Sequence, residues 1–321
     1  MNRGLRFLGL LLGVAIVVWL LARADIAALF GVFPRIGWGF VAILAARGAT
    51  VIIDCAAWSC LLPRSERPSF APMLPLRWIA ESINTMLPAA QIGGEVVRAR
   101  LLQQRVAAPA RGAASVAVDF SLGLFAQILF TLLGFVLLAR LGHMADWWQA
   151  ALSAALVPAF AVFSWELLVR RRLLAAARDW AEHLGQYRLA AALRTLGAAL
   201  GLIDTSRAAL ARSLTLHLTS LFGHAGELWL TLYLMGISTG AADAVLLESL
   251  SLAARSAAFL IPSGWGAQEA TLVALATLTG LSTETALALG LVKRAREIAV
   301  GVPGLAAWAI AERARPLTHR R

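Results

Sequence analysis

Six stretches of this chain are long and apolar enough to cross a lipid bilayer as helices, and they constrain the fold more than any other feature. They cover residues 5–22, 38–62, 112–138, 148–169, 213–236 and 284–311. Crossing a bilayer takes about 20 apolar residues in one helix, and a helix satisfies its backbone hydrogen bonds without water. The composition, with 60% hydrophobic and 15% charged residues, is also more apolar than that of a typical soluble domain. The sequence therefore predicts an all-α integral membrane protein.

The distribution of charge predicts how the chain is oriented. Lys and Arg total 29 against 18 Asp and Glu, and the basic residues are dispersed between the apolar stretches. We therefore expect anionic lipid surfaces rather than nucleic acid as partners. With the N-terminus inside, twenty of the 29 fall in cytoplasmic segments, in agreement with the positive-inside rule. The sequence thus predicts a multi-pass protein of a bacterial inner membrane, with both termini in the cytoplasm. An uncleaved first helix is favoured over a signal peptide, because further spans follow it.

Two further apolar segments, 74–104 and 243–279, are too long for one helix and are interrupted by proline and glycine. They contain similar motifs at an offset of 174 residues, PAAQIGGE at 88–95 and PSGWGAQE at 262–269. We interpret both segments as re-entrant hairpins, with simple tight turns as the alternative. The helix-breaking residues are Pro88, Gly93, Gly94, Pro262, Gly264 and Gly266.

The same offset indicates an internal repeat. It places span 38–62 on 212–236 and span 112–138 on 286–312, so each half consists of a span, a hairpin and a span. In the predicted orientation the two hairpins enter from opposite sides, which makes the repeat inverted, as in many membrane transporters. The predicted fold is therefore six full spans plus two re-entrant broken-helix hairpins in an inverted repeat.

The predicted organisation is a single membrane domain, 1–321. Its parts are an N-terminal helix at 1–37, repeat one at 38–140, a connecting span with cytoplasmic surface helices at 141–211, repeat two at 212–312 and a basic tail at 313–321. Arginines mix with Leu, Ala and Trp at helical spacing in the connecting segment, which is typical of helices lying on a membrane surface. A solvated connector between the two halves is the alternative.

Many charged residues lie within the apolar segments and require an explanation, because a charge in hydrocarbon is costly and usually faces a cavity or a partner. The returning helix of the first hairpin begins around Ile92 to Gly94, where its free N–H groups can hold an anionic or hydroxylated headgroup. In the last span Lys293 can reach Glu297, and the offset matches Glu81 with Arg255 and Asp119 with Lys293, which suggests buried pairs. The candidate substrate-binding residues are Glu81, Asn84, Glu95, Arg98, Asp119, Arg255, Glu269, Lys293, Arg294 and Glu297. A salt-bridge network that only fixes packing is the alternative.

The run RWIAESINTMLPAAQIGGEVVRARLL at 77–102, together with IPSGWGAQEA at 261–270 and the charged last span, resembles a known family. It is similar to the flippase-like transmembrane region of lysylphosphatidylglycerol synthases, and most of all to its stand-alone HpnL-like branch, which is associated with hopanoid biosynthesis. The resemblance implies lipid translocation with the two hairpins at the substrate path. The matching motif positions are Asn84, Pro88, Gly93, Gly94, Glu95, Arg98, Pro262, Gly264, Gly266, Gln268 and Glu269. Because the chain stops at Arg321, without the synthases' aminoacyl-transferring domain, we do not expect lipid aminoacylation.

The sequence favours a lipid translocator that moves a hopanoid or a phospholipid between leaflets and is not an enzyme. It contains no GxxxxGK[ST] loop, so movement would be downhill or ion-coupled, with buried carboxylates as candidate proton carriers. We expect no cofactor and no metal, since His217 and His224 lack a metal-binding spacing. Two alternatives are a non-transporting scaffold that binds lipid-biosynthesis enzymes and an intramembrane enzyme that modifies lipid headgroups.

Overall fold

The computed structural model describes most of the two predicted repeats. The described residues are 33–62, 67–87, 92–103, 105–106, 109–140, 207–258 and 266–313, with scattered residues between 176 and 187. Within them every regular element is a helix, which confirms the predicted all-α fold class. The predicted spans 5–22 and 148–169 lie outside the described residues, as do Pro88, Pro262 and Gly264. The count of six spans therefore stays a prediction.

Each half contains a long helix, a pair of shorter helices and a second long helix. The first half contains α3 (Phe33–Ile36), α4 (Gly39–Ser59), α5 (Phe70–Met86), α6 (Gly93–Leu102) and α7 (Pro109–Arg140). The second half contains α11 (Arg207–Leu234), α12 (Ala241–Ala257), α13 (Ala267–Ala276), the short helix η3 (Thr277–Thr279) and α14 (Thr283–Arg313). These helices fall on the four described spans and the two hairpins that the sequence predicts.

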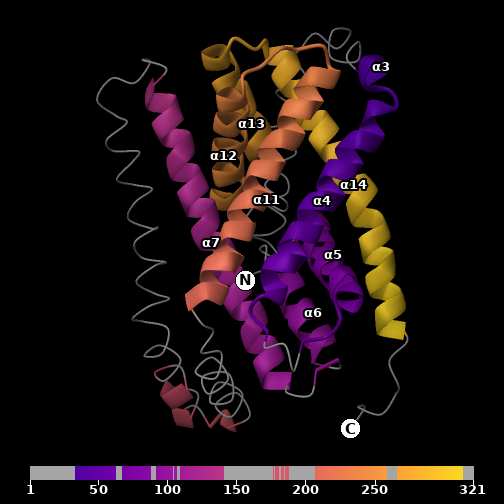
Figure 1. Cartoon of the computed structure of the whole chain (residues 1–321), viewed down its shortest axis with the longest axis vertical. Coiled ribbons are helices and arrows are strands. Elements are labelled where there is room, and N and C mark those ends of the chain that lie inside the picture. Colours follow the sequence, from indigo (N-terminus) through magenta and orange to yellow (C-terminus); the bar gives the residue numbers. More distant parts are fainter. Residues whose placement is uncertain are drawn as a thin grey trace.

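The helix boundaries follow the offset of 174 residues. Shifting α6 by this amount places it on α13 at both ends, and the same shift places the first residue of α7 on the first residue of α14. Figure 1 shows that the halves run in opposite directions: α4 descends while α11 rises, and α7 rises while α14 descends. The α5–α6 pair lies toward the lower end of the view and the α12–α13 pair toward the upper end. The two broken segments thus approach the middle of the bundle from opposite ends.

The two halves pack through reciprocal helix pairs. Helix α5 packs against α14 of the other half, and its counterpart α12 packs against α7, while α4 lies along α11. Glycines permit the close approach, because a Cβ atom built on Gly304 would lie 2.0 Å from Ser82 Oγ, and one on Gly134 would lie 2.0 Å from Ser249 Oγ. Small residues at such crossings are typical of helix packing in membranes.

The outer surface of the helices is apolar. Among the described residues, α4 and α7 are long and apolar enough to cross a membrane by length and composition, with mean hydropathy of 1.8 and 2.3. Large apolar side chains are exposed on these and several other helices, as expected of a surface that contacts lipid. They include Ile52, Val96, Val136, Phe222, Tyr233, Ile298, Val302 and Ile310.

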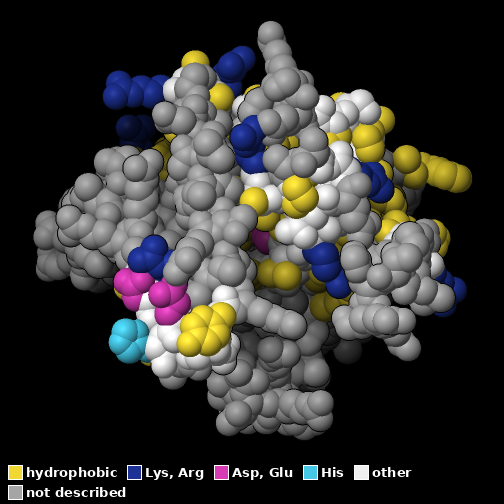
Figure 2. Space-filling view, turned by 90° about the horizontal axis from the view of Figure 1, so that it is seen from below, with side chains coloured by type: hydrophobic (Ala, Val, Ile, Leu, Met, Phe, Trp, Pro, Cys, Tyr) yellow, Lys and Arg dark blue, Asp and Glu magenta, His cyan; other side chains and the backbone are white. Residues whose placement is uncertain are grey.

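Basic residues concentrate at one end of the bundle. The C-terminal ends of α6 and α14 and the N-terminal ends of α7 and α11 lie together there (Figure 1) and carry Arg100, Arg111, Arg207, Arg212 and Arg313. Figure 2 shows basic side chains spread over this end of the molecule. The positive-inside rule favours the cytoplasmic side for such an end, and the orientation of the chain stays a prediction.

Candidate functional site

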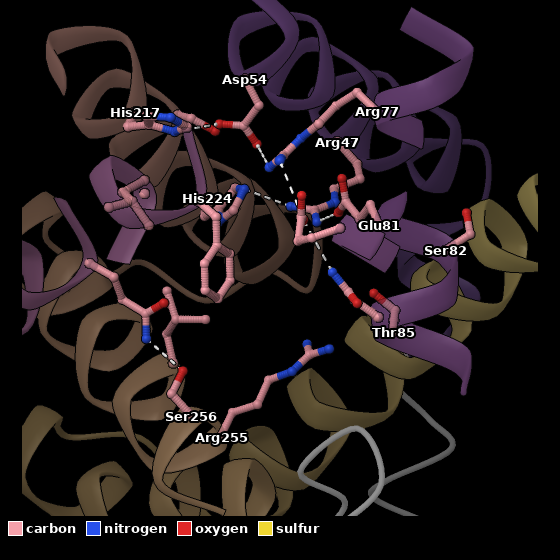
Figure 3. A pocket seen from close by; sticks show the side chains of 18 of the residues that line it. Arg47, Asp54, Arg77, Glu81, Ser82, Thr85, His217, His224, Arg255 and Ser256 are labelled. Atoms are coloured by element: carbon pink, nitrogen blue, oxygen red, sulfur yellow. Dashed lines mark hydrogen bonds and ion pairs between the residues drawn. The ribbon is translucent and has the colours of Figure 1, made fainter. Parts of the chain in front are cut away.

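A cavity of about 380 Å³ lies between the two halves and is the candidate site. Helices α4, α5, α6 and α7 of the first half and α11, α12 and α14 of the second all contribute to its wall. Figure 3 shows polar side chains from these helices pointing toward one another across the cavity. The charged and histidine residues in the wall are Arg47, Asp54, Arg77, Glu81, Glu95, Asp119, His217, His224, Arg255, Arg296 and Glu297.

Five residues of the first half form what we call the first charge cluster: Asp54, Arg77, Glu95, Arg98 and Asp119. Arg77 lies 3.1 Å from Asp54, 3.7 Å from Asp119 and 3.9 Å from Glu95, measured between guanidinium nitrogens and carboxylate oxygens. Arg98 lies 2.6 Å from Glu95 and 2.8 Å from Asp119. Two arginines therefore share three carboxylates.

Arg98 is completely buried and stands behind the cavity wall. Its guanidinium carbon lies 4.6 Å from the centre of the Trp58 ring, which adds a cation–π contact to the two ion pairs. Trp58 is held in turn by a hydrogen bond that its Nε1 donates to Ser115 Oγ over 3.1 Å. A charge so deeply buried is tolerated only when partners surround it, and here an aromatic face and two carboxylates do so.

His217 of α11 reaches from the second half into the first charge cluster. Its Nε2 lies 3.0 Å from Asp119 Oδ1, and its Nδ1 lies 3.5 Å from Asp54 Oδ1. Figure 3 shows His217 beside Asp54 at the edge of the cavity. The histidine thus joins α11 to α4 and α7.

A second polar group spans the cavity near its centre (Figure 3). Arg47 forms an ion pair with Glu81 and lies 2.6 Å from His224 Nε2. Because arginine is always a donor, His224 Nε2 must accept here, which fixes a neutral imidazole with its proton on Nδ1. The two cavity histidines therefore have opposite surroundings.

The second half contains what we call the second charge cluster: Glu227, Glu248, Arg255, Glu269, Lys293, Arg294, Arg296 and Glu297. Glu297 is its centre, at 2.6 Å from both Arg255 and Arg294 and 3.6 Å from Arg296. Arg294 also lies 2.7 Å from Glu269, and Lys293 lies 2.5 Å from Glu248. Arg296 completes the set with an ion pair to Glu227 at 2.9 Å. All eight residues are thus held by partners within the second half.

The N-termini of the returning helices are occupied by side chains of the protein itself. The Gly94 N–H donates to Asn84 Oδ1 over 2.8 Å, and the Gly266 N–H donates to Glu269 Oε2 over 2.9 Å. Gly266 adopts φ +81°, a left-handed conformation that glycine allows without strain. The expectation that the start of α6 holds a headgroup is therefore wrong for the Gly94 N–H, because Asn84 satisfies it.

The structure brings the ten predicted substrate-binding residues to one region, in two layers. Six line the cavity: Glu81, Asn84, Glu95, Asp119, Arg255 and Glu297. The other four, Arg98, Glu269, Lys293 and Arg294, stand behind the wall and hold the first layer or its neighbours. Their role in binding stays a prediction.

The partners that the sequence suggested for these charges differ from those in the structure. Lys293 bonds Glu248 of α12 rather than Glu297 one turn away. Asp119 bonds Arg98 and His217 instead of Lys293. The offset matches Glu81 with Arg255, whereas in the structure Glu81 forms an ion pair with Arg47 and Arg255 forms one with Glu297.

Sequence reasoning left several wall residues out of the candidate set. Four of them could have been identified because each is a charge within an apolar segment: Arg47, Asp54, Arg77 and Arg296. The two histidines were set aside because they lack a metal-binding spacing, yet both line the cavity. Their partners come from other helices, so a spacing rule along one helix could not identify them.

Comparison with known proteins assigns the chain to a family. The model of the family described as the lysylphosphatidylglycerol synthase TM region matches residues 6–304, which include both hairpins and both charge clusters. No curated protein and no solved structure gives a significant match. The family resemblance seen in the sequence is thereby confirmed, whereas the HpnL-like branch stays a prediction. The chain belongs to the lysylphosphatidylglycerol synthase transmembrane-region family and is a membrane protein of lipid-related processes.

Proposed function

We propose that this protein translocates a lipid between the leaflets of a bacterial inner membrane. The polar headgroup would occupy the cavity between the two halves, while the apolar part of the lipid stays in the bilayer. The observation that carries the proposal is the charged cavity itself, which both halves of an inverted repeat enclose. Transporters with inverted repeats hold their substrates at this place, near the midplane where broken helices meet.

The cavity wall contains polar atoms that still need a partner. Glu81 Oε2, Arg77 Nε and Arg296 Nε are buried and form no hydrogen bond to other described residues. Buried polar atoms are satisfied in the great majority of cases, so these three atoms have hydrogen-bonding capacity that the described residues leave unused. Both donors and an acceptor are present, which suits a headgroup that combines hydroxyl, ammonium or phosphate groups. This unused capacity favours binding over a network that serves only packing.

The proposal takes the lipid to be a hopanoid or a phospholipid and the protein to move it without altering it. The family match supports a lipid-related role, and the resemblance to HpnL-like proteins favours the hopanoid. A scaffold for lipid-biosynthesis enzymes would need no polar cavity at its centre. In the proposed orientation the basic end of the bundle faces the cytoplasm.

Lipid exchange in liposomes tests the proposal. Purified protein is reconstituted with a fluorescent phosphatidylethanolamine or a fluorescent hopanoid, and a membrane-impermeant quencher reports how much label has reached the outer leaflet. We expect the wild-type protein to accelerate exchange. Glu81→Gln, a change in the cavity wall, should abolish it.

Glu312→Gln is the matched control, because Glu312 also pairs with an arginine, Arg100, but lies at the end of the bundle away from the cavity. This variant should exchange lipid at the wild-type rate. Melting temperatures in detergent confirm that both variants are folded. Exchange at the protein-free rate with every lipid would refute translocation and leave the scaffold as the better explanation.

A further inference from the structure

The first charge cluster lacks one positive charge among the described residues. It contains three carboxylates, Asp54, Glu95 and Asp119, against two arginines, Arg77 and Arg98. The second charge cluster is balanced, with four carboxylates against three arginines and one lysine. The remaining pair, Arg47 with Glu81, is balanced as well. An unbalanced carboxylate is costly in a membrane interior, so one further cation is needed beside the first cluster.

His217 stands where that cation is needed. Both of its ring nitrogens face carboxylate oxygens, at 3.0 Å from Asp119 and 3.5 Å from Asp54. A neutral imidazole has one N–H and can donate to only one of them, whereas the imidazolium has two N–H groups and can donate to both. One additional proton on His217 therefore places an N–H toward each aspartate and balances the charge of the cluster.

The other charged groups beside these contacts come from α5 and α6, whereas the cavity charges of α12 and α14, which are Arg255, Arg296 and Glu297, pair within the second half. Arg77 of α5 approaches both aspartates, at 3.1 and 3.7 Å. Arg98 of α6 holds the far side of Asp119 at 2.8 Å. On α7 the ring contacts Asp119 and also faces Gly123, which has no side chain, and on α11 itself the next histidine, His224, is turned to Arg47. Arg77 and Arg98 contact the aspartates rather than the ring, so a proton is the cation that fits.

The same contacts join the two halves of the fold. His217 belongs to α11 of the second half, whereas Asp54 and Asp119 belong to α4 and α7 of the first. Loss of the proton removes one N–H donor and leaves one carboxylate facing a lone pair, which weakens this junction. Binding and release of the proton at His217 therefore change how strongly the two halves are held together beside the cavity.

We propose that His217, with Asp54 and Asp119, is a proton-binding site and that lipid translocation is coupled to proton movement through it. The inference rests on the proposed function and adds the energy source to it. A proton from water in the cavity binds the free ring nitrogen of His217, and the same proton returns to water when the junction opens toward the other side. One proton is taken up and one released in each cycle, and no other reactant is required.

Liposomes with a pH difference across the membrane test the coupling. With one proton moved for each lipid, a difference of one pH unit should shift the leaflet distribution of the fluorescent lipid by up to about tenfold. His217→Gln should abolish this shift and bring the distribution back to that found without a gradient. His183→Gln is the matched control: it removes an exposed histidine that does not line the cavity, and it should keep the gradient-dependent shift.

A second measurement follows the proton without any lipid movement. In protein with ¹⁵N-labelled histidine, the resonances missing from His217→Gln identify His217. Near neutral pH in detergent they should show a ring protonated on both nitrogens, and Asp119→Asn should shift them toward the neutral ring. A neutral His217 at every pH at which the protein is folded would overturn the proton site.

The outcomes separate the two proposals. A wild-type protein that fails to move any lipid refutes translocation. If the lipid moves but its leaflet distribution is the same at every pH difference, translocation is supported and proton coupling is refuted. A shift that His217→Gln retains would also overturn the role of this residue.

Discussion

Replacing Gly94 with alanine should destabilise the first hairpin. A Cβ atom at this position would lie 2.0 Å from the carbonyl oxygen of Ala80, where ordinary contacts begin at 3.4 Å, so α5 and α6 must separate by about 1.4 Å. Overpacking costs about 1–3 kcal/mol, and loss of the hydrogen bond from Gly94 to Asn84 adds about 1 kcal/mol. The better helix propensity of alanine offsets at most about 1 kcal/mol. We therefore expect the free energy of unfolding to fall by about 1–3 kcal/mol.

Thermal unfolding of the purified protein in detergent measures this effect. The expected loss lowers Tm by about 2–4 °C for each kcal/mol in chains of a few hundred residues. Gly48→Ala and Gly226→Ala are matched controls, since both glycines lie within long helices and a Cβ atom on either would contact nothing within 4 Å. If Gly94→Ala melts at or above the temperature of these controls, the close approach of α5 and α6 is refuted.

Three further changes have definite expected results. Arg98→Met leaves two buried carboxylates short of a partner and should destabilise the protein by about 3–5 kcal/mol. Arg100→Met, at a half-exposed ion pair, should lower the free energy of unfolding by less than about 1 kcal/mol. Denaturant unfolding in micelles compares the two variants, and equal losses would contradict the burial of Arg98. Gly304→Val should lower Tm because its side chain would displace a serine of α5 that lies 2.0 Å from the built Cβ atom; an unchanged Tm would argue against the α5–α14 crossing. In a variant without native cysteines, a cysteine at Ser282 should react with a membrane-impermeant maleimide from the periplasm and one at Arg105 only from the cytoplasm; the reverse pattern would disprove the predicted orientation.

The broken hairpins could be predicted from sequence because their signals are local. Proline and glycine interrupt an apolar run that is too long for one helix, and the motif recurs at a fixed offset. The match of α6 with α13 at both ends shows how closely that offset governs the helix boundaries. A repeat constrains both halves at once, so two weak local signals became one strong prediction.

The partners of the charges could not be predicted, because they are set by tertiary contacts. Helical spacing allows Lys293 to reach Glu297. In the structure, however, Glu297 forms ion pairs with three arginines, and Lys293 forms one with Glu248. His217 meets a carboxylate 98 residues away in the chain, and no local pattern marks that contact. A charge in an apolar segment predicts that a partner exists, whereas only the packing of helices decides which one.

The reciprocal packing of the hairpins determines which parts of the protein can move as rigid units. Helix α5 packs more extensively against α14 than against α6, its partner in the hairpin, and α12 likewise packs more extensively against α7 than against α13. A rearrangement that separated repeat one from repeat two would have to break both of these interfaces. A rearrangement that preserves both interfaces must move α5 together with α14 and α12 together with α7. The mobile units of a transport cycle would then be composites of both repeats, and the boundary between the repeats in the sequence would not be the boundary at which the protein bends.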